Sequence, residues 1–287
     1  MMWPKPDNPD VMARMRTAHA LARAALDVSP AANTHEAWGW HGRTLSQPVT
    51  TPHGPAWLRV ACAPTGRVVA TFWDGSIEAA TAIPASVPRP RLRRWHDWND
   101  QCWEYRAELY DHAPARPAAT SPVLTTVPDL PTAWWAALRV TLDDIASVRT
   151  SRMTIHQCFL DHTMPRLLGT PIDTTAPRPW TTAHGDFHFA NISAPTLCLF
   201  DFEGWGLAPP GYDAAMLHNY SLLVPPIAAR IRTELVEILD TPSGRFAELV
   251  VITELLHAAT RGDHLALAEP LRRRASLLLG RTVPAHI

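Results

Sequence analysis

The stretch over residues 184–191, HGDFHFAN, constrains the fold of this chain more than any other. It sets two histidines, an aspartate and an asparagine close together, and Asp201 follows Asn191 by ten residues, directly after the apolar run LCLF. Polar residues at this density fit neither a regular helix nor a regular strand, so we expect a loop. A short strand over residues 197–202 should then return Asp201 to that loop.

The polar residues of the loop match what phosphoryl transfer requires. That reaction needs a carboxylate to orient the attacking hydroxyl and oxygen ligands for Mg²⁺, which neutralises phosphate charge. Asp186 can serve as the base, while Asn191 and Asp201 can bind the metal. Two alternatives use the same residues. One is a loop whose polar groups only cap and brace the backbone. The other is a metal-dependent hydrolase that uses His184, Asp186 and His188, although the sequence has neither HxHxDH nor HExxH.

The rest of the chain divides into two parts of different character. Up to about residue 111 it resembles a small sheet-rich lobe, and after the proline-rich stretch 113–131 it becomes mostly helical. In the first part we expect helices over residues 10–26 and 77–83 and strands over residues 36–45, 56–61, 67–71, 92–98 and 103–110. In the second we expect helices over residues 132–148, 151–168, 212–223, 228–240, 243–261 and 264–279. A sheet lobe joined to a helical lobe leaves a cleft between them, where ligands bind.

HGDFHFAN resembles the HGDxHxxN catalytic loop of the aminoglycoside phosphotransferase and choline kinase-like superfamily, and LFDFEGWGLAPPGYDAAML (residues 199–217) resembles its metal-binding segment. The resemblance implies an α+β, bilobal, protein-kinase-like fold. The nucleotide-binding lobe would span residues 1–111 and the helical lobe residues 112–287. By resemblance Asp186 is the catalytic base, Asn191 and Asp201 bind Mg²⁺, and His184 and His188 support the loop. Asp213, in the GYD turn, would be structural.

The nucleotide side of the site carries weaker signals. The strand AWLRV resembles the family's apolar-Lys-apolar strand, but Arg59 stands at the lysine position, and arginine and lysine are not equivalent there. Glu78 is the expected partner of Arg59. In GWHGRT, Gly42 with Thr44 or Ser46 is expected to approach a phosphate, although this is no P-loop. The backbone of three consecutive residues is expected to meet the adenine at the hinge: Leu109, Tyr110 and Asp111.

The acceptor side is defined least. Glu203 is a candidate contact for the acceptor, and Trp205 a candidate for stacking on an acceptor ring. Six later acidic residues have the spacing of solvated helix faces, so the sequence does not indicate an aminoglycoside site: Glu234, Glu237, Asp240, Glu248, Glu254 and Asp263. We therefore expect a kinase that uses ATP, or alternatively GTP, with Mg²⁺ to phosphorylate a hydroxyl of a small molecule, either an antibiotic such as an aminoglycoside or a metabolite. The rival is a catalytically silent kinase-like binding protein, suggested by Arg59 and the sparse glycines.

Composition bears on partners and compartment. The formal net charge is −1, which implies no nucleic-acid partner, and no run of roughly 18 apolar residues predicts a membrane span. Four widely spaced cysteines form no CxxC pair, which fits a reducing cytoplasm. The sequence leaves the oligomeric state open.

Overall fold

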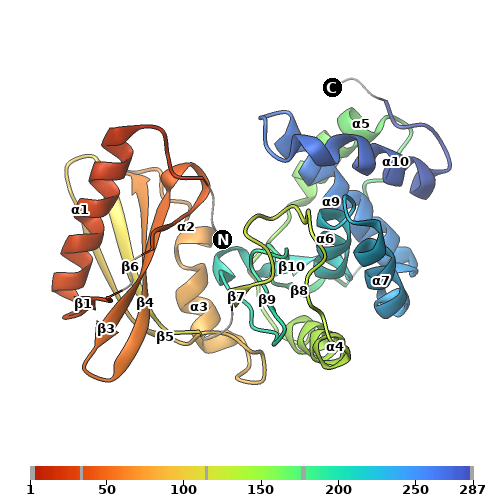
Figure 1. Ribbon diagram of the computed structural model, residues 1–287. Coiled ribbons are helices and arrows are strands. Elements are labelled where there is room, and N and C mark those ends of the chain that lie inside the picture. The colour runs from red at the N-terminus through yellow and green to blue at the C-terminus, as the bar shows by residue number, and fades with distance from the viewer. Residues whose placement is uncertain (1–3, 33–34, 114–115, 176–178, 285–287) are drawn as a thin grey trace.

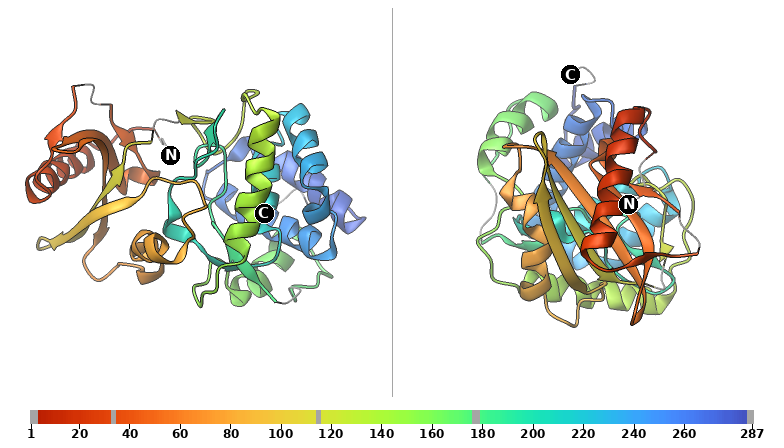
Figure 2. Two further views of the ribbon diagram at one scale, coloured as in Figure 1. Left: turned by 90° about the horizontal axis from the view of Figure 1, so that it is seen from below. Right: turned by 90° about the vertical axis from the view of Figure 1, so that its left-hand side faces the viewer.

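A computed structural model describes residues 4–32, 35–113, 116–175 and 179–284. The chain forms a sheet lobe and a helical lobe that lie side by side, and the two views in Figure 2 show that helix α1 covers the outer face of the sheet (Figures 1 and 2). This arrangement confirms the expected α+β architecture. Residues 114 and 115 of the expected proline-rich connection lie outside the described part.

The sheet lobe is built on one antiparallel sheet with the strand order β1-β3-β4-β6-β5, and β2 pairs with β3. Its strands are β1 (Ser29–Pro30), β2 (Ala37–Trp38), β3 (Thr44–Thr51), β4 (Gly54–Pro64), β5 (Leu92–Asn99) and β6 (Trp103–Asp111). Alternate residues of β4, such as Leu58 and Val60, are fully buried in a core with Met15 of α1 (Pro9–Ala25), as the period of a half-buried strand requires. Helix α1 was expected over residues 10–26, which agrees to within one residue at each end.

Two short helices lie on the inner side of the sheet, between it and the helical lobe (Figure 1). They are α2 (Ala70–Trp73) and α3 (Gly75–Ala82). The strand expected over residues 67–71 is therefore wrong. Both edges of β4 are already paired, with β3 and β6, so this segment has no free edge beside β4 and coils instead. Ala79 and Ile83 pack into the core of the helical lobe rather than that of the sheet lobe.

The helical lobe surrounds α9 (Pro242–Ala259), which contacts α5, α6 and α10. Its other helices are α4 (Thr132–Ala146), α5 (Gln157–Leu168), α6 (Tyr212–Tyr220), α7 (Pro225–Glu234), α8 (Val236–Leu239) and α10 (Ala268–Leu279). Two small antiparallel pairs flank the loop of residues 184–191: β7 (Arg116–Pro117) with β9 (Ser193–Ala194), and β8 (Thr181–Ala183) with β10 (Gly206–Ala208). The helix expected from residue 151 begins six residues later. Within the described ranges, no helix has the length and apolar content that crossing a bilayer requires.

Candidate active site

The loop of residues 184–191 follows β8 and is fixed by Asp213 at the start of α6. The Asp213 carboxylate accepts the backbone N–H of His184 at 2.7 Å and that of Gly185 at 3.2 Å. Burial raises the pKa of Asp213 to about 7, although these two N–H donors favour the charged form. Gly185 has φ +89°, and a Cβ there would lie 2.4 Å from the carbonyl oxygen of Gly204. Only glycine fits this turn.

Asp186 presents its carboxylate to the cleft between the lobes, with its side chain 37% exposed. The Asn191 amide donates to Asp186 Oδ2 at 2.9 Å, and His188 Nε2 lies 3.2 Å from Oδ1. Burial acts to raise the pKa of Asp186, but His188 and the Asn191 amide outweigh it and hold the pKa below its usual range. The group is therefore a fixed carboxylate at neutral pH, able to accept a hydrogen bond from a hydroxyl.

His184 and His188 lie beneath this carboxylate and are both buried. His184 Nε2 lies 2.9 Å from the carbonyl oxygen of Phe200, and its ring packs 4.4 Å from that of Phe202. Burial lowers the pKa of His184 to about 4, so the ring is neutral. His184 thus joins the loop to the segment that carries Asp201.

Asp201 comes next to Asn191 without the regular strand that we expected over residues 197–202. A single bridge pairs Leu199 with Ile192, and the N–H of Phe200 donates to the carbonyl oxygen of Asn191 at 2.8 Å. These contacts suffice to return the acid to the loop. Asp201 itself is left-handed, with φ +64°, a conformation that non-glycine residues adopt mainly where surrounding structure enforces it.

Two buried oxygens at this point have no hydrogen-bond partner within the described residues: Asn191 Oδ1 and Asp201 Oδ1. Buried polar atoms are normally satisfied, so the pair requires an explanation. Amide and carboxylate oxygens suit Mg²⁺, which typically uses one or two carboxylates together with waters and phosphates. The residues present therefore fit a magnesium ion. Over the ranges that the structure describes, no group of three or more His, Cys, Asp or Glu side chains could hold a metal.

Arg59 reaches this region from β4, and its guanidinium is held by carboxylates from both lobes. Nη1 lies 2.9 Å from Oε2 of Glu108, the residue opposite Arg59 on β6, while Nη2 contacts Glu203 and lies 3.7 Å from Asp201 Oδ1. The expected pairing of Arg59 with Glu78 is wrong. Glu78 instead lies 2.6 Å from Nη1 of Arg152, because its helix faces the helical lobe.

Arg152 was not singled out in the sequence, yet it links the two lobes. Besides Glu78, it donates to the carbonyl oxygens of Trp205 at 2.9 Å and Glu203 at 3.2 Å, and also to that of Thr71. Its side chain is only 9% exposed. An isolated arginine in a loop carries no signal of such a role, since its partners are brought together only by the tertiary fold.

Of the two acceptor candidates, only Glu203 lines the cleft. Burial raises the pKa of Glu203 to about 7 in spite of the neighbouring Arg59 cation. Trp205 is 2% exposed, its Nε1 donates to the carbonyl oxygen of Gly75 at 2.9 Å, and the Arg152 guanidinium covers its ring at 5.0 Å. The expectation that Trp205 stacks on an acceptor is therefore wrong, because the ring seals the junction between the lobes.

The turn before β3 faces the cleft in part. Thr44 lines the cleft, together with Trp40 and Arg43. Gly42 does not, and a Cβ there would lie 2.7 Å from Pro6 and 2.8 Å from Val11. The expected approach of Gly42 to a phosphate is therefore wrong, since this glycine allows the N-terminal segment to pack closely.

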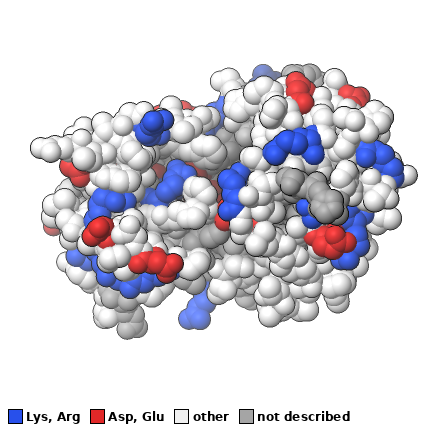
Figure 3. Space-filling view, turned by 90° about the horizontal axis from the view of Figure 1, so that it is seen from above, with Lys and Arg blue, Asp and Glu red and all other residues white. Residues whose placement is uncertain are grey.

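At the hinge, Tyr110 and Asp111 line the cleft, but Leu109 is 3% exposed and belongs to the core of the sheet lobe. The Asp111 N–H already donates to the carbonyl oxygen of Arg91 at 3.0 Å, and Tyr110 OH donates to Glu108 at 3.0 Å. The cleft as a whole has a volume of about 1570 Å³. Figure 3 shows a hollow between the lobes, with Lys and Arg side chains along its borders.

No protein-family model matches the sequence, and no curated protein is significantly similar to it. Solved structures do match. Aminoglycoside phosphotransferase APH(4)-Ia aligns over 92% of this chain and 98% of its own at 13% identity and a TM-score of 0.63. The microcompartment-associated aminopropanol kinase aligns over 91% and 94% at 15% identity and 0.52, and a Plasmodium vivax ethanolamine kinase over 95% and 89% at 10% identity and 0.50. At these identities the likeness shows the fold alone, and that fold is the one that the resemblance of the 184–191 loop implied.

Proposed function

We propose that this chain is an ATP-dependent O-phosphotransferase that transfers the γ-phosphoryl group to a hydroxyl of a small molecule. The observation that carries the proposal is the Asp186 carboxylate, which accepts a hydrogen bond from Asn191, together with the buried oxygens of Asn191 and Asp201 that have no hydrogen-bond partner among the described residues. It lies in the cleft of a fold shared with small-molecule phosphotransferases. APH(4)-Ia has been crystallised with ADP or AMP-PNP, which supports a nucleotide as the donor.

The residues of the chain divide the work of transfer between them. Asp186 accepts a hydrogen bond from the acceptor hydroxyl and orients it toward the γ-phosphorus. As the new P–O bond forms, the bond to the β–γ bridging oxygen breaks, ADP leaves with that electron pair, and the hydroxyl proton passes to Asp186. Asn191 and Asp201 would hold Mg²⁺, which supplies neutralisation of phosphate charge when bound. Arg59 would stabilise the phosphates from the sheet lobe. Positioning and charge stabilisation, rather than proton abstraction, supply most of the acceleration.

Magnesium-dependent ATP binding and slow ATP hydrolysis test this proposal. We expect Mg²⁺ and ATP together to raise the melting temperature of the wild type. Asp186→Asn should retain that shift while losing about 10²- to 10⁴-fold in turnover. Asp143→Asn, an exposed carboxylate on α4 outside the cleft, is the matched control and should behave as the wild type does. Absence of any nucleotide-dependent shift with Mg²⁺, or full activity of Asp186→Asn, would overturn the proposal.

A second candidate is a nucleotide-binding protein without transfer activity. It is favoured by the contact of Arg59 with Asp201 and Glu203, which sets a cation beside the oxygen that should bind the metal. In that case the nucleotide would raise the melting temperature equally with and without Mg²⁺, and no hydrolysis would be detected in the wild type.

A further inference from the structure

Beyond Asp186, the cleft is walled by a row of three aromatic rings. The Tyr220 ring lies 5.2 Å from that of His188 in the catalytic loop, and 5.3 Å from that of His264 on the other side. Tyr220 OH is 3.4 Å from His264 Nε2. Tyr220, His188 and His264 all line the cleft, with Ala119 and Pro122 nearby. Tyr220 and His188 are 5% and 1% exposed, so the half-buried His264 presents most of the accessible ring surface, which is suited to one face or edge of a flat ring.

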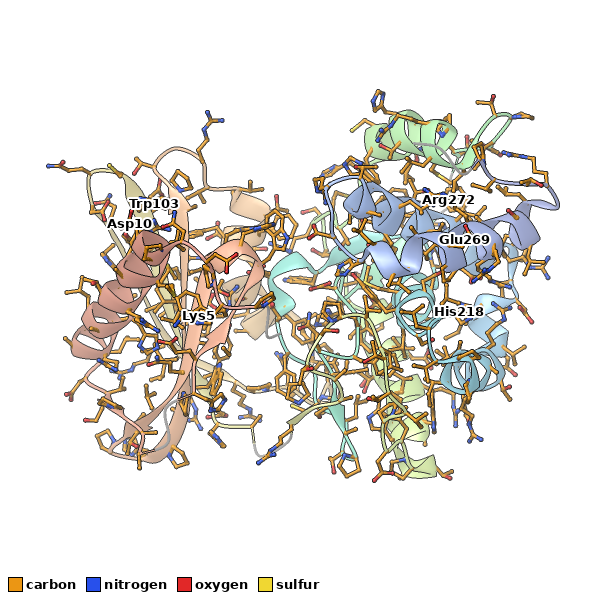
Figure 4. All side chains as sticks on the ribbon, turned by 45° about the horizontal axis from the view of Figure 1, so that its top comes forward. Lys5, Asp10, Trp103, His218, Glu269 and Arg272 are labelled. Atoms are coloured by element: carbon orange, nitrogen blue, oxygen red, sulfur yellow. The ribbon has the colours of Figure 1, made fainter. Side chains whose placement is uncertain are left out.

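Carboxylates are scarce on the same wall. Seven acidic residues follow Asp213, and only Asp263 lines the cleft. Most of the others are committed elsewhere: Glu234 to Arg139, Asp240 to Arg232, Glu248 to His218 and Arg274, and Glu254 to Tyr212. In Figure 4, Glu269 lies on α10 and His218 among the helices, both away from the gap between the lobes.

The unpaired charge of the cleft is mostly positive, and Asp263 is the one cleft carboxylate that enters no ion pair among the described residues. Among the described residues, the side chains of Arg43, Arg91, Arg116 and Arg261 line the cleft and enter no ion pair. The remaining carboxylates of the cleft all have basic neighbours: Arg59 for Asp201 and Glu203, Arg93 for Asp111, and His188 for Asp186. Arg261 stands at the acceptor end, at the close of α9 and three residues before His264. An acceptor with several ammonium groups would meet the unpaired Arg261 there, and like charges across an interface are unfavourable.

The mouth of the cleft is apolar on the side of the sheet lobe. Trp40 is 37% exposed and Phe72 is 47% exposed, and both line the cleft. Large aromatic side chains left open to solvent within a cleft are typical of ligand contact.

From these features we infer that the acceptor is a ring-bearing alcohol that is anionic or neutral, with its ring on Tyr220 and His264 and any anionic group facing Arg261. The inference rests on the proposed kinase function and adds the substrate class to it. Polycationic aminosugars are disfavoured as acceptors.

Three benzylic alcohols of nearly equal size test the inference, because they differ in charge: 4-(hydroxymethyl)benzoate, 1,4-benzenedimethanol and 4-(aminomethyl)benzyl alcohol. Kanamycin serves as the polycation. With ATP and Mg²⁺, mass spectrometry of the phosphorylated product gives kcat/KM for each, and saturation-transfer NMR with AMP-PNP and Mg²⁺ gives binding. We expect kcat/KM for the anionic alcohol to exceed that for the cationic one by roughly two- to fivefold. A single, partly exposed charge contact with the acceptor provides a preference of about this size.

Arg261→Glu should remove or reverse this preference. Arg149→Glu, an exposed arginine after α4 that does not line the cleft, is the matched control and should leave the preference as in the wild type. Equal or better use of the cation or kanamycin, an unchanged preference in Arg261→Glu, or no binding of any ring alcohol would overturn the inference. Hydrolysis of ATP that depends on Asp186 would persist in each of those outcomes. Its loss would instead count against the kinase function itself.

Discussion

Replacing Arg59 with methionine should destabilise the protein strongly, because it leaves Glu108 charged and buried without its cation. The Arg59 side chain is 13% exposed and that of Glu108 only 1%. Removing one partner of a buried ion pair costs about 3–5 kcal/mol. Glu108 keeps its 3.0 Å hydrogen bond from Tyr110 OH, so we expect the lower end, about 3 kcal/mol. Asp201 and Glu203 are more exposed, at 22% and 28%, and water compensates them better.

Urea unfolding at pH 7 measures this change, and in thermal unfolding it corresponds to a lower Tm by about 6–12 °C. The double variant Arg59→Met with Glu108→Gln tests the cause. Neutralising the stranded carboxylate should recover at least half of the loss, because an uncharged buried pair lacks the desolvation penalty of an unpaired ion. Arg67→Met, at an exposed position on the same lobe, is the control and should change the stability by less than about 0.5 kcal/mol. A loss below about 1 kcal/mol in Arg59→Met, or a double variant no more stable than the single one, would refute this reasoning.

Three further perturbations probe the helical lobe. Asp201→Asn should weaken the dependence of ATP binding on Mg²⁺, seen as a smaller difference in melting temperature with and without the metal; an unchanged difference would remove Asp201 from the metal site. Asp213→Ala should lower the free energy of unfolding by about 2 kcal/mol, since the buried N–H of His184 and the half-buried N–H of Gly185 lose a shared acceptor, whereas Asp213→Asn should lose less. Burial raises the pKa of Glu254 to about 8, above the unfolded value near 4.5, so its protonated form favours the fold, and the stability should fall between pH 5 and 8. Glu254→Gln keeps an acceptor for Tyr212 OH and should flatten that fall in urea titrations; equal slopes would contradict the assignment.

The elements with a clear hydrophobic period were the most predictable part of the chain. The amphipathic α1 and the paired strands β4 and β6 agree with their expected ranges to within a few residues, because local pattern and tertiary burial favour the same structure. The segment around Val69 was wrongly predicted as a strand. Its two adjacent valines are β-branched and favour a strand, but only where a neighbouring strand has a free edge with which to pair. The loop of residues 184–191 was predictable for a different reason. Histidine, aspartate and asparagine side chains at this density usually either take part in catalysis or form the hydrogen bonds that hold a loop.

Pairings between lobes could not be predicted. Glu78 and Arg59 had suitable charges and a plausible order along the chain, but helix α3 faces Arg152, and the cross-strand register had already placed Glu108 opposite Arg59. Trp205 lies close in sequence to Asp201, yet its indole is buried under α3. Which side chain reaches which depends on how the lobes dock, and one sequence carries little information about that.

The segment formed by α2 and α3 is gripped from both lobes by arginines. Arg106 of β6 donates to the carbonyl oxygen of Trp73 and pairs with Asp74 at 3.0 Å, while Arg152 holds Glu78 from the opposite lobe. The segment therefore acts as a spacer of fixed thickness. Any widening of the cleft on this side has to break the contacts of either Arg106 or Arg152. Both arginine side chains are nearly sealed from solvent, at 6% and 9% exposed, whereas Asp74 and Glu78 are 47% and 49% exposed, so salt screens the two ion pairs but not the hydrogen bonds from the arginines to the carbonyl oxygens of Trp73 and Thr71. The opening on this side should accordingly keep its width across ionic strengths that would loosen a hinge held by surface charges.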